Sequence, residues 1–206
     1  MHHNTAEIAA LQPDYLGFIF WEPSKRNYTK SNETVPEGIV KTGVFVKAPV
    51  ETIIQNVKSH DLKAIQLHGN ETVEELIELK KQLKKEGISV AVIKVFSVKN
   101  SFNFNVLAPF EAHCDFFLFD TKGELPGGNG THFSWQLLQN YSSTKPYFLS
   151  GGIGLNDIEA IGNFYRSPAA TYCHAIDVNS KFETAPGHKN STALRTFVTA
   201  IASLKK

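Results

Sequence analysis

The sequence predicts a single α/β domain, residues 1–206, built around a parallel β-sheet. Three observations carry this prediction. Runs of apolar, β-branched and aromatic residues alternate with stretches of helical periodicity, an order typical of βαβ units. Most of these runs are continuously hydrophobic, as in strands that are buried on both faces of a parallel sheet. The length of 206 residues and the hydrophobic fraction of 42% suit one domain with a complete core.

We expect seven strands and five helices along the chain. The strands are expected at residues 15–21, 41–46, 64–67, 90–96, 116–120, 147–150 and 175–178. The helices are expected at residues 5–11, 72–86, 133–141, 156–165 and 191–204. The second helix has the clearest pattern, because Leu76, Leu79 and Leu83 recur at helical spacing opposite a face rich in Lys and Glu. Gly87 then supplies a signal for the helix to stop.

The expected helix at 5–11 has no strand candidate before it. A closed eight-stranded barrel would need one more strand ahead of that helix, whereas an open doubly wound sheet would not. The spacing of the elements leaves both folds open. A barrel without one strand would expose two unpaired sheet edges, which invite pairing with another chain. In that case we expect reduced stability and either a monomer or a homodimer.

The composition excludes several classes of partner. Lys and Arg number 21 and Asp and Glu number 20, so a net charge of +1 gives no attraction to nucleic acid or to an anionic membrane. The longest apolar stretch is about seven residues, whereas a transmembrane helix needs about 20. No signal-peptide pattern is present, and the two cysteines imply no disulfide framework. We therefore expect a soluble, cytoplasmic protein whose partner is a small molecule.

Two turns near the end of the chain are candidates for a phosphate site. Gly151 and Gly152 follow an expected strand and precede an expected helix, and glycine lets the backbone approach a ligand closely. The next expected strand leads into Asn179 and Ser180. In (βα)8 enzymes the loops after the seventh and eighth strands often bind phosphate. The alternative is that these glycines only form tight turns.

Asp120 is the candidate general acid. It ends the expected strand 116–120 after four apolar residues, and poor solvation there favours the protonated carboxyl group that a general acid needs. A glycine-rich segment, 127–131, follows it, and such a segment can close over a ligand. The alternative is an aspartate that only caps a helix or tethers a loop.

Five stretches of the sequence resemble the phosphoribosylanthranilate isomerase family, in the order in which the family carries them. They are Pro13-Asp14-Tyr15-Leu16-Gly17-Phe18-Ile19-Phe20 with Ser24-Lys25-Arg26; Gln66-Leu67-His68-Gly69; Asp120-Thr121 with Gly127-Gly128-Asn129-Gly130 and Phe133-Ser134-Trp135; Ser150-Gly151-Gly152-Ile153; and Asp177-Val178-Asn179-Ser180 with Glu183, Pro186-Gly187 and Lys189. The resemblance implies a (βα)8 TIM barrel of the ribulose-phosphate-binding type, of which this chain would lack the first strand.

The resemblance also implies an activity in tryptophan biosynthesis. It is the Amadori rearrangement of N-(5-phosphoribosyl)anthranilate to 1-(2-carboxyphenylamino)-1-deoxyribulose 5-phosphate, which requires no metal and no organic cofactor. Asp120 would be the general acid, and Asp177 would orient the substrate amine. Arg26, which alone would read as an ordinary exposed arginine, would pair with the anthranilate carboxylate, for which a guanidinium is well shaped. The phosphate would be held by backbone groups of the two turns, at Gly151, Gly152, Asn179 and Ser180.

The general base of this family is a cysteine at the end of the first strand, in a run like Lys-Val-Cys-Gly-Met. The sequence has no such run. We therefore expect that the natural protein starts upstream of Met1, and that turnover by this chain is impaired.

The two cysteines of the chain are poor substitutes for that base. Cys114 and Cys173 both precede expected strands, which would place them at the end of a barrel opposite to its active site. We expect them to be buried as small hydrophobic residues. His68 and His132 lie nearer the expected active end, and either would be a weak base.

Two other interpretations remain open. A non-catalytic barrel that binds a phosphorylated ligand would keep the two turns and lack the base. Another barrel enzyme with a phosphorylated, ribose-derived substrate, such as indole-glycerol phosphate synthase, would need a catalytic Lys and Glu at strand ends. Lys94 lies within a strand, but no acidic partner for it is evident from the sequence.

Overall fold

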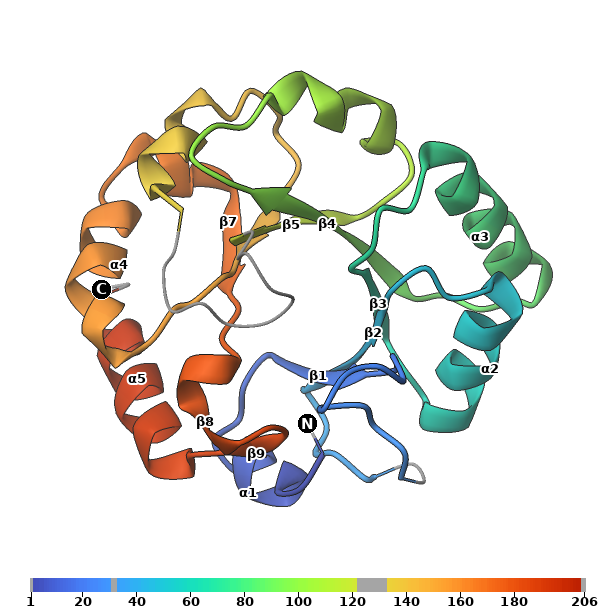
Figure 1. The fold of residues 1–206 in the computed structure, drawn as a ribbon, viewed down its shortest axis with the longest axis horizontal. Coiled ribbons are helices and arrows are strands. Elements are labelled where there is room, and N and C mark those ends of the chain that lie inside the picture. The colour runs from blue at the N-terminus through green and yellow to red at the C-terminus, as the bar shows by residue number, and fades with distance from the viewer. Residues whose placement is uncertain (1, 31–32, 122–132, 205–206) are drawn as a thin grey trace.

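The computed structural model describes residues 2–30, 33–121 and 133–204, and within them the chain forms a seven-stranded parallel sheet. The strands are β1 Tyr15–Ile19, β2 Val40–Phe45, β3 Ala64–Leu67, β4 Ala91–Val98, β5 Phe116–Thr121, β6 Tyr147–Leu149 and β7 Cys173–Ile176. The sheet curls, and the helices surround it (Figure 1). All seven expected strands are therefore confirmed, with ends that differ from the expected ones by up to two residues.

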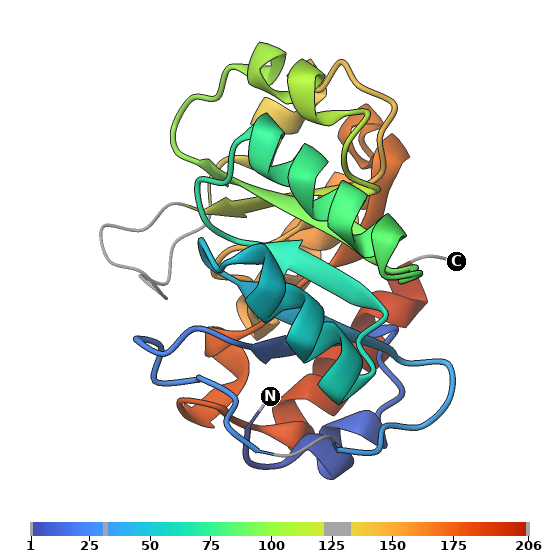
Figure 2. The ribbon, with the colours of Figure 1, turned by 90° about the vertical axis from the view of Figure 1, so that its right-hand side faces the viewer.

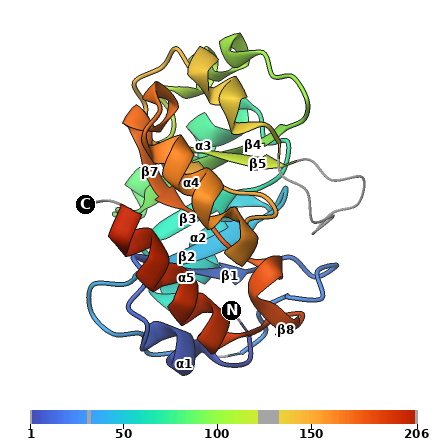
Figure 3. The same ribbon diagram turned by 90° about the vertical axis from the view of Figure 1, so that its left-hand side faces the viewer.

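Helices and short 3-10 turns connect the strands. The α-helices are α1 Thr5–Ala9, α2 Val50–His60, α3 Val73–Lys85, α4 Ile158–Tyr165 and α5 Ser191–Leu204. The 3-10 helices are η1 Phe104–Phe110, η2 Trp135–Asn140, η3 Leu155–Asp157, η4 Pro168–Tyr172 and η5 Ser180–Phe182. A small antiparallel hairpin, β8 Glu183–Ala185 and β9 His188–Lys189, follows η5. Helices α2 and α3 cover one side of the sheet (Figure 2), and α4 and α5 cover another (Figure 3).

The order of strands decides between the two folds that the sequence left open. The strands are hydrogen-bonded in chain order, β1 to β7, and each adjacent pair is parallel. A doubly wound sheet reverses its strand order at a switch point. The curled sheet with sequential order is therefore of the α/β-barrel type, and the doubly wound alternative is wrong. The expectation of an eighth strand ahead of β1 stays a prediction.

The strands are buried on both faces, as their continuous hydrophobic runs predict. In β3 all four residues are buried. The larger core cluster includes side chains of α2 and α3, so it lies between the sheet and the helices. The smaller cluster consists of strand residues, namely Ala64, Ile93, Val95, Leu118 and Phe148, and fills the inside of the curl. At the same inner face the Tyr15 hydroxyl, on β1, lies 2.9 Å from His174 Nε2, on β7, so the first and last strands of the sheet approach each other there.

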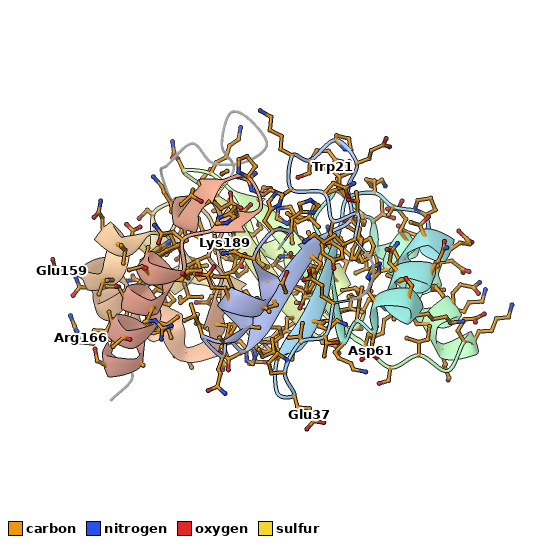
Figure 4. The ribbon with its side chains drawn as sticks, turned by 90° about the horizontal axis from the view of Figure 1, so that it is seen from below. Trp21, Glu37, Asp61, Glu159, Arg166 and Lys189 are labelled. Carbon is orange, nitrogen blue, oxygen red and sulfur yellow. The ribbon has the colours of Figure 1, made fainter. Side chains whose placement is uncertain are left out.

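Because all strands of the sheet are parallel, their carboxyl ends lie at one end of the barrel. Figure 4 shows Trp21, which follows β1, at this end, and Glu37 and Asp61, which precede β2 and β3, at the other end. Active sites of such barrels lie at the carboxyl end. Both cysteines lie toward the opposite end, since Cys114 precedes β5 by two residues and Cys173 is the first residue of β7.

Two helical segments differ from the sequence expectation. Helix α2 was missed, although Val50, Ile53 and Val57 provide an apolar stripe at helical spacing. The segment 133–141 was expected to be helical and forms the 3-10 helix η2. Apolar periodicity alone does not distinguish a short 3-10 helix from an α-helix, because both place side chains three to four residues apart on one face.

Helix α3 begins with a complete capping box, which suggests a direct test of its contribution to stability. The Thr72 hydroxyl accepts from the Glu75 backbone N–H at 3.3 Å, and the Glu75 carboxylate accepts from the Thr72 N–H at 2.7 Å. We predict that Thr72→Ala lowers the free energy of unfolding by about 1 kcal/mol, measured by urea denaturation. The control is Thr52→Ala, an exposed threonine within α2, for which we expect a change within about 0.5 kcal/mol. Equal losses in both variants would contradict the role of the cap.

Candidate active site

Four strand ends bring the acidic candidates together with a histidine and a serine. Asp120 lies near the carboxyl end of β5, and its Oδ2 is 3.3 Å from Nε2 of His68, the residue that follows β3. The Ser150 hydroxyl, after β6, donates to Asp177 Oδ2 at 2.8 Å, after β7. The two pairs are close enough that the charges of Asp120 and His68 act on Asp177. One cluster at the carboxyl end therefore contains both predicted carboxylates.

Sheet hydrogen bonds continue beyond the strand ends and hold this cluster in place. The Ser150 N–H donates to the Phe119 carbonyl at 2.9 Å, and the Asp177 N–H donates to the Leu149 carbonyl at 2.8 Å. The His68 N–H donates to the Phe45 carbonyl at 2.7 Å. The backbone of each site residue is thus fixed by its neighbouring strand rather than by a loop.

Asp177 is the strongest candidate for a group that holds a proton. Burial of its carboxyl group raises its pKa, and the nearby negative charge of Asp120 acts in the same direction. The hydrogen bond from Ser150 and the charges of His68 and Lys189 act in the opposite direction, but they do not cancel the effect of burial. The family resemblance implied only a role in orienting the substrate for this residue, and its burial could not be predicted from a local pattern.

The side chains of Asp120 and His68 are partly exposed to solvent. That of Asp120 is 25% exposed, and that of His68 is 34% exposed. A ligand at the carboxyl end can therefore reach both groups directly. The glycine-rich segment 127–131 that was expected to close over the ligand, and His132, lie outside the described residues.

The turn after β6 requires glycine at position 151. Gly151 has a φ of +98°, and a Cβ there would lie 2.3 Å from the backbone nitrogen of Thr121. The Thr121 hydroxyl donates to the Gly151 carbonyl at 3.3 Å, so the ends of β5 and β6 are in close contact. Gly152 also has a positive φ, +71°. A tight turn between packed strand ends explains part of this glycine pattern without a ligand.

The turns after β6 and β7 lie side by side. A Cβ on Gly154 would lie 3.2 Å from the Cβ of Lys181, in η5. Asn179 precedes η5 with φ −140° and ψ −95°, and its carbonyl accepts from Lys189 Nζ at 3.0 Å. The two turns predicted to form a phosphate site are therefore neighbours in space, as that prediction requires.

Arg26 reaches the carboxyl end from the connection between β1 and β2, and its guanidinium is bound by Glu183. Nε lies 3.0 Å and 2.8 Å from the two carboxylate oxygens, and Nη2 lies 2.6 Å from Oε2. Glu183 also accepts from Lys189 Nζ at 3.0 Å and from the Gly187 N–H at 3.1 Å. Burial alone would raise the pKa of Glu183, but Arg26, Lys189 and Gly187 together lower it. Arg26 is thus held by an ion pair with Glu183, and its expected role in ligand binding stays a prediction.

The structure supplies the acidic partner of Lys94 that the sequence did not reveal. Lys94 Nζ lies 2.8 Å from Glu71 Oε2 and donates to the Gly69 carbonyl at 2.7 Å, and both side chains are buried. Burial lowers the pKa of Lys94, and Glu71 partly offsets this effect. Glu71 also accepts from the backbone N–H groups of Lys47 and Gly69. The pair therefore tethers the segment that carries His68.

Both cysteines lie toward the amino ends of their strands, as the sequence predicts, but only Cys114 is buried as expected. The Cys114 thiol is buried, and it donates to the Phe110 carbonyl at 3.4 Å. Burial raises its pKa to about 11, so little thiolate exists at neutral pH. Cys173 is partly exposed and lies 3.7 Å from the Ala175 carbonyl. Neither thiol belongs to the cluster around Asp120.

Two further searches cover the described part of the chain. Among residues 2–30, 33–121 and 133–204, no three His, Cys, Asp or Glu side chains are grouped so as to hold a metal ion. Over the same residues, no helix has both the length and the apolar character needed to cross a membrane.

Comparison with known proteins identifies the family. The sequence model described as N-(5'phosphoribosyl)anthranilate (PRA) isomerase matches residues 2–200. The N-(5'-phosphoribosyl)anthranilate isomerase of Parabacteroides distasonis is 38% identical over 207 residues, which cover 96% of this chain and 88% of that protein. The crystal structure of the isomerase from Thermus thermophilus is 25% identical with a TM-score of 0.79, over 97% of this chain and 93% of that one.

A second solved structure shares the fold and contains a ligand. It is a phosphoribosyl anthranilate isomerase in complex with reduced 1-(o-carboxyphenylamino)-1-deoxyribulose 5-phosphate. It is 24% identical, with a TM-score of 0.73, over 96% of this chain and 92% of that one. Taken with the barrel-type sheet, the clustered carboxylates and the paired turns, the match over residues 2–200 means that this chain belongs to the phosphoribosylanthranilate isomerases, enzymes of tryptophan biosynthesis.

Proposed function

We propose that this chain binds N-(5-phosphoribosyl)anthranilate and is built for its Amadori rearrangement to 1-(2-carboxyphenylamino)-1-deoxyribulose 5-phosphate. The observation that carries the proposal is the cluster of Asp120, His68 and Asp177 beside the two adjacent turns after β6 and β7. A phosphorylated sugar with an arylamino group needs proton-transfer groups near C1 and an anion site at the other end. The relative that is bound to the reduced product supports the same assignment.

The reaction moves protons within one molecule and has no net oxidation. An acid protonates the ribose ring oxygen as the C1–O bond breaks, which leaves a Schiff base between C1 and the anthranilate nitrogen. A base then removes the proton from C2 to give an enolamine. Protonation at C1 and loss of the proton from the C2 hydroxyl yield the ketone. Each proton that is gained at one position is lost at another, so acid and base groups suffice.

Asp120 is proposed as the general acid. Its partly exposed carboxyl group lies at the carboxyl end of β5, where a ligand in the site can contact it. The imidazole of His68, 3.3 Å away, stabilises the carboxylate that remains after proton donation. Asp177, whose pKa is raised by burial, is proposed to hold the substrate amine by a hydrogen bond, and Ser150 fixes its orientation.

The two anionic ends of the substrate have separate sites in the proposal. The anthranilate carboxylate pairs with Arg26. The phosphate is bound by backbone groups of the paired turns, at Gly151, Gly152, Asn179 and Ser180. The positive φ of both glycines and the contact between the turns support this assignment, since such backbone concavities bind anions.

The proposed reaction also needs a general base. The family resemblance assigns that role to a cysteine, and both cysteines of this chain lie near the amino ends of β5 and β7. We propose that turnover by this chain is impaired for that reason. The second candidate function is a non-catalytic barrel that binds the same phosphorylated ligand, and the following test separates the two.

We predict that isomerase activity depends on a cysteine supplied ahead of α1. The assay follows the loss of phosphoribosylanthranilate fluorescence for the chain and for a version extended at its N-terminus with Lys-Val-Cys-Gly. The matched control carries Lys-Val-Ser-Gly. We expect turnover to rise only with the cysteine, and Asp120→Asn in that extended chain to lower kcat by about 10²- to 10⁴-fold.

Calorimetry with the reduced product completes this test. Tight binding without turnover in every version would favour the non-catalytic barrel, and full activity of the Asp120→Asn variant would remove the assigned role of Asp120. Absence of binding by the folded chain would contradict both candidate functions.

We predict that Gly151→Ala weakens binding of the reduced product, because the added Cβ overlaps Thr121 and displaces the turn. The matched control is Gly38→Ala, whose φ of +91° is similar but whose Cβ would meet nothing within 4 Å. Both variants should lose about 1–2 kcal/mol of stability from the left-handed backbone, and Gly151→Ala should lose more because of the overlap with Thr121. Only Gly151→Ala should lose affinity in calorimetry, and equal affinities for the two variants would argue against the turn as a phosphate site.

We predict that Asp177→Asn makes the chain more stable at pH 7.5 while it weakens binding of the reduced product. Burial raises the pKa of Asp177 above its ordinary value of 3.8, so its contribution to stability is most favourable below that value and is lost as the pH rises through the raised pKa. Urea denaturation should therefore show a gain for the variant at pH 7.5 that narrows toward pH 4. The control is Glu86→Gln, since Lys58 lowers the pKa of Glu86 and its loss should not stabilise the chain. A variant less stable than the parent at pH 7.5 would contradict the prediction.

A further inference from the structure

Glu183 lies at the centre of a buried hydrogen-bond network that joins three segments of the site. Its side chain is 5% exposed, and it begins the hairpin β8–β9 directly after η5. Arg26, Lys189 and the Gly187 N–H all donate to its carboxylate. The proposed reaction needs no carboxylate at this position for proton transfer, so the network calls for another explanation.

Glu183 occupies only one edge of the Arg26 guanidinium. An arginine carries five N–H groups in a planar fork, and a carboxylate can pair with it along the Nε/Nη2 edge or along the Nη1/Nη2 edge. Glu183 takes Nε and Nη2. Among the described residues, the structure gives Nη1 no partner. The Arg26 side chain is 22% exposed, so part of it remains accessible while the first edge is held.

Lys189 extends the network to the turn that is proposed to bind phosphate. Its side chain is 8% exposed, and Nζ donates to the Asn179 carbonyl at 3.0 Å, to the Asn179 side-chain oxygen and to Glu183 at 3.0 Å. These three contacts use all three N–H groups of the ammonium. Lys189 is therefore committed to the backbone of Asn179 and is not free to act as a phosphate ligand itself.

The charges of the network also favour anions. Arg26 and Lys189 carry two positive charges, and Glu183 carries one negative charge, which leaves one positive charge between the two anion sites. The pKa of Glu183 is lowered by its three donors, which keeps the carboxylate charged at neutral pH. The network thus remains intact over the pH range in which the enzyme would work.

We propose that Glu183 is a positioning residue that sets both anion sites at once. It holds the second edge of Arg26 toward the ligand carboxylate and, through Lys189, fixes Asn179 for the ligand phosphate. The site then selects ligands that carry a carboxylate and a phosphate at one fixed separation. This inference rests on the proposed function, because the two anions are those of the proposed substrate.

The test compares two ligands by calorimetry. One is the reduced product, and the other is the same compound with a phenylamino group in place of the carboxyphenylamino group. The parent chain should prefer the first ligand. Glu183→Gln removes the charge at nearly the same volume and should weaken binding of the first ligand by roughly 10- to 100-fold. The second ligand should lose less affinity, because only its phosphate, near Asn179, is affected. Glu86→Gln, which removes a carboxylate from the surface pair with Lys58, should change neither affinity.

A double-mutant cycle with Arg26→Lys isolates the part of the Glu183 effect that acts through Arg26. Arg26→Lys should lose the preference for the carboxylate, and adding Glu183→Gln should not reduce that preference further. If Glu183→Gln keeps the preference and both affinities of the parent, the positioning role is wrong while the proposed function stands. If the parent chain binds neither ligand, the proposed function itself fails.

A measurement on the parent chain keeps the inference testable even if the Glu183 variant does not fold. The Arg26 Nε–H resonance, assigned by its loss in Arg26→Lys, should exchange slowly with solvent because Glu183 accepts from it. We expect the exchange to stay slow when the reduced product binds. Faster exchange on binding would mean that Arg26 leaves Glu183 for the ligand. This result would contradict the proposal that Glu183 and the ligand carboxylate bind to different edges of the Arg26 guanidinium.

Discussion

The parallel pairing of seven strands in chain order is the constraint on which the rest of the structure depends. Because every strand runs in the same direction, the residues that follow β3, β5, β6 and β7 meet at one end of the sheet. His68, Asp120, Ser150 and Asp177 come from segments that are distant in sequence, yet each is held by a hydrogen bond to the neighbouring strand or lies within a strand. The sheet therefore sets the positions of these four residues.

Two buried ion pairs add the fine positioning that the sheet does not provide. Lys94 with Glu71 tethers the segment of His68, and Lys189 with Glu183 tethers Asn179 and Arg26. Such pairs contribute little net stability, because the loss of hydration opposes the attraction, whereas removal of one partner costs about 3–5 kcal/mol. Their value lies in geometry, since each lysine uses its N–H groups on backbone carbonyls as well as on its carboxylate.

The sequence predicted the strands, but it did not predict the hydrogen-bond network around Glu183. Strand β3 was predicted to the residue, because three of its four side chains are apolar, and only the buried Gln66 interrupts the run. Strand β7 begins two residues before its predicted start, where the exposed His174 interrupts the apolar pattern. Arg26 and Glu183 are 157 residues apart, and no local pattern links them. The positions of Asp120 and Asp177 followed from strand ends, but the burial that raises the pKa of Asp177 depends on what packs around it.

The hairpin β8–β9 also determines when the site can exist during synthesis. Its residues bond back to the start of the chain, where the Asn4 side chain donates to the Lys189 carbonyl at 2.8 Å and the His3 N–H donates to the Gly187 carbonyl at 3.1 Å. A nascent chain can pair β1 to β6 one strand at a time as the strands leave the ribosome. Arg26 has no carboxylate to hold it until residue 183 has emerged. The hydrogen-bond network around Glu183 can therefore form only late in translation, after most of the sheet has been synthesised.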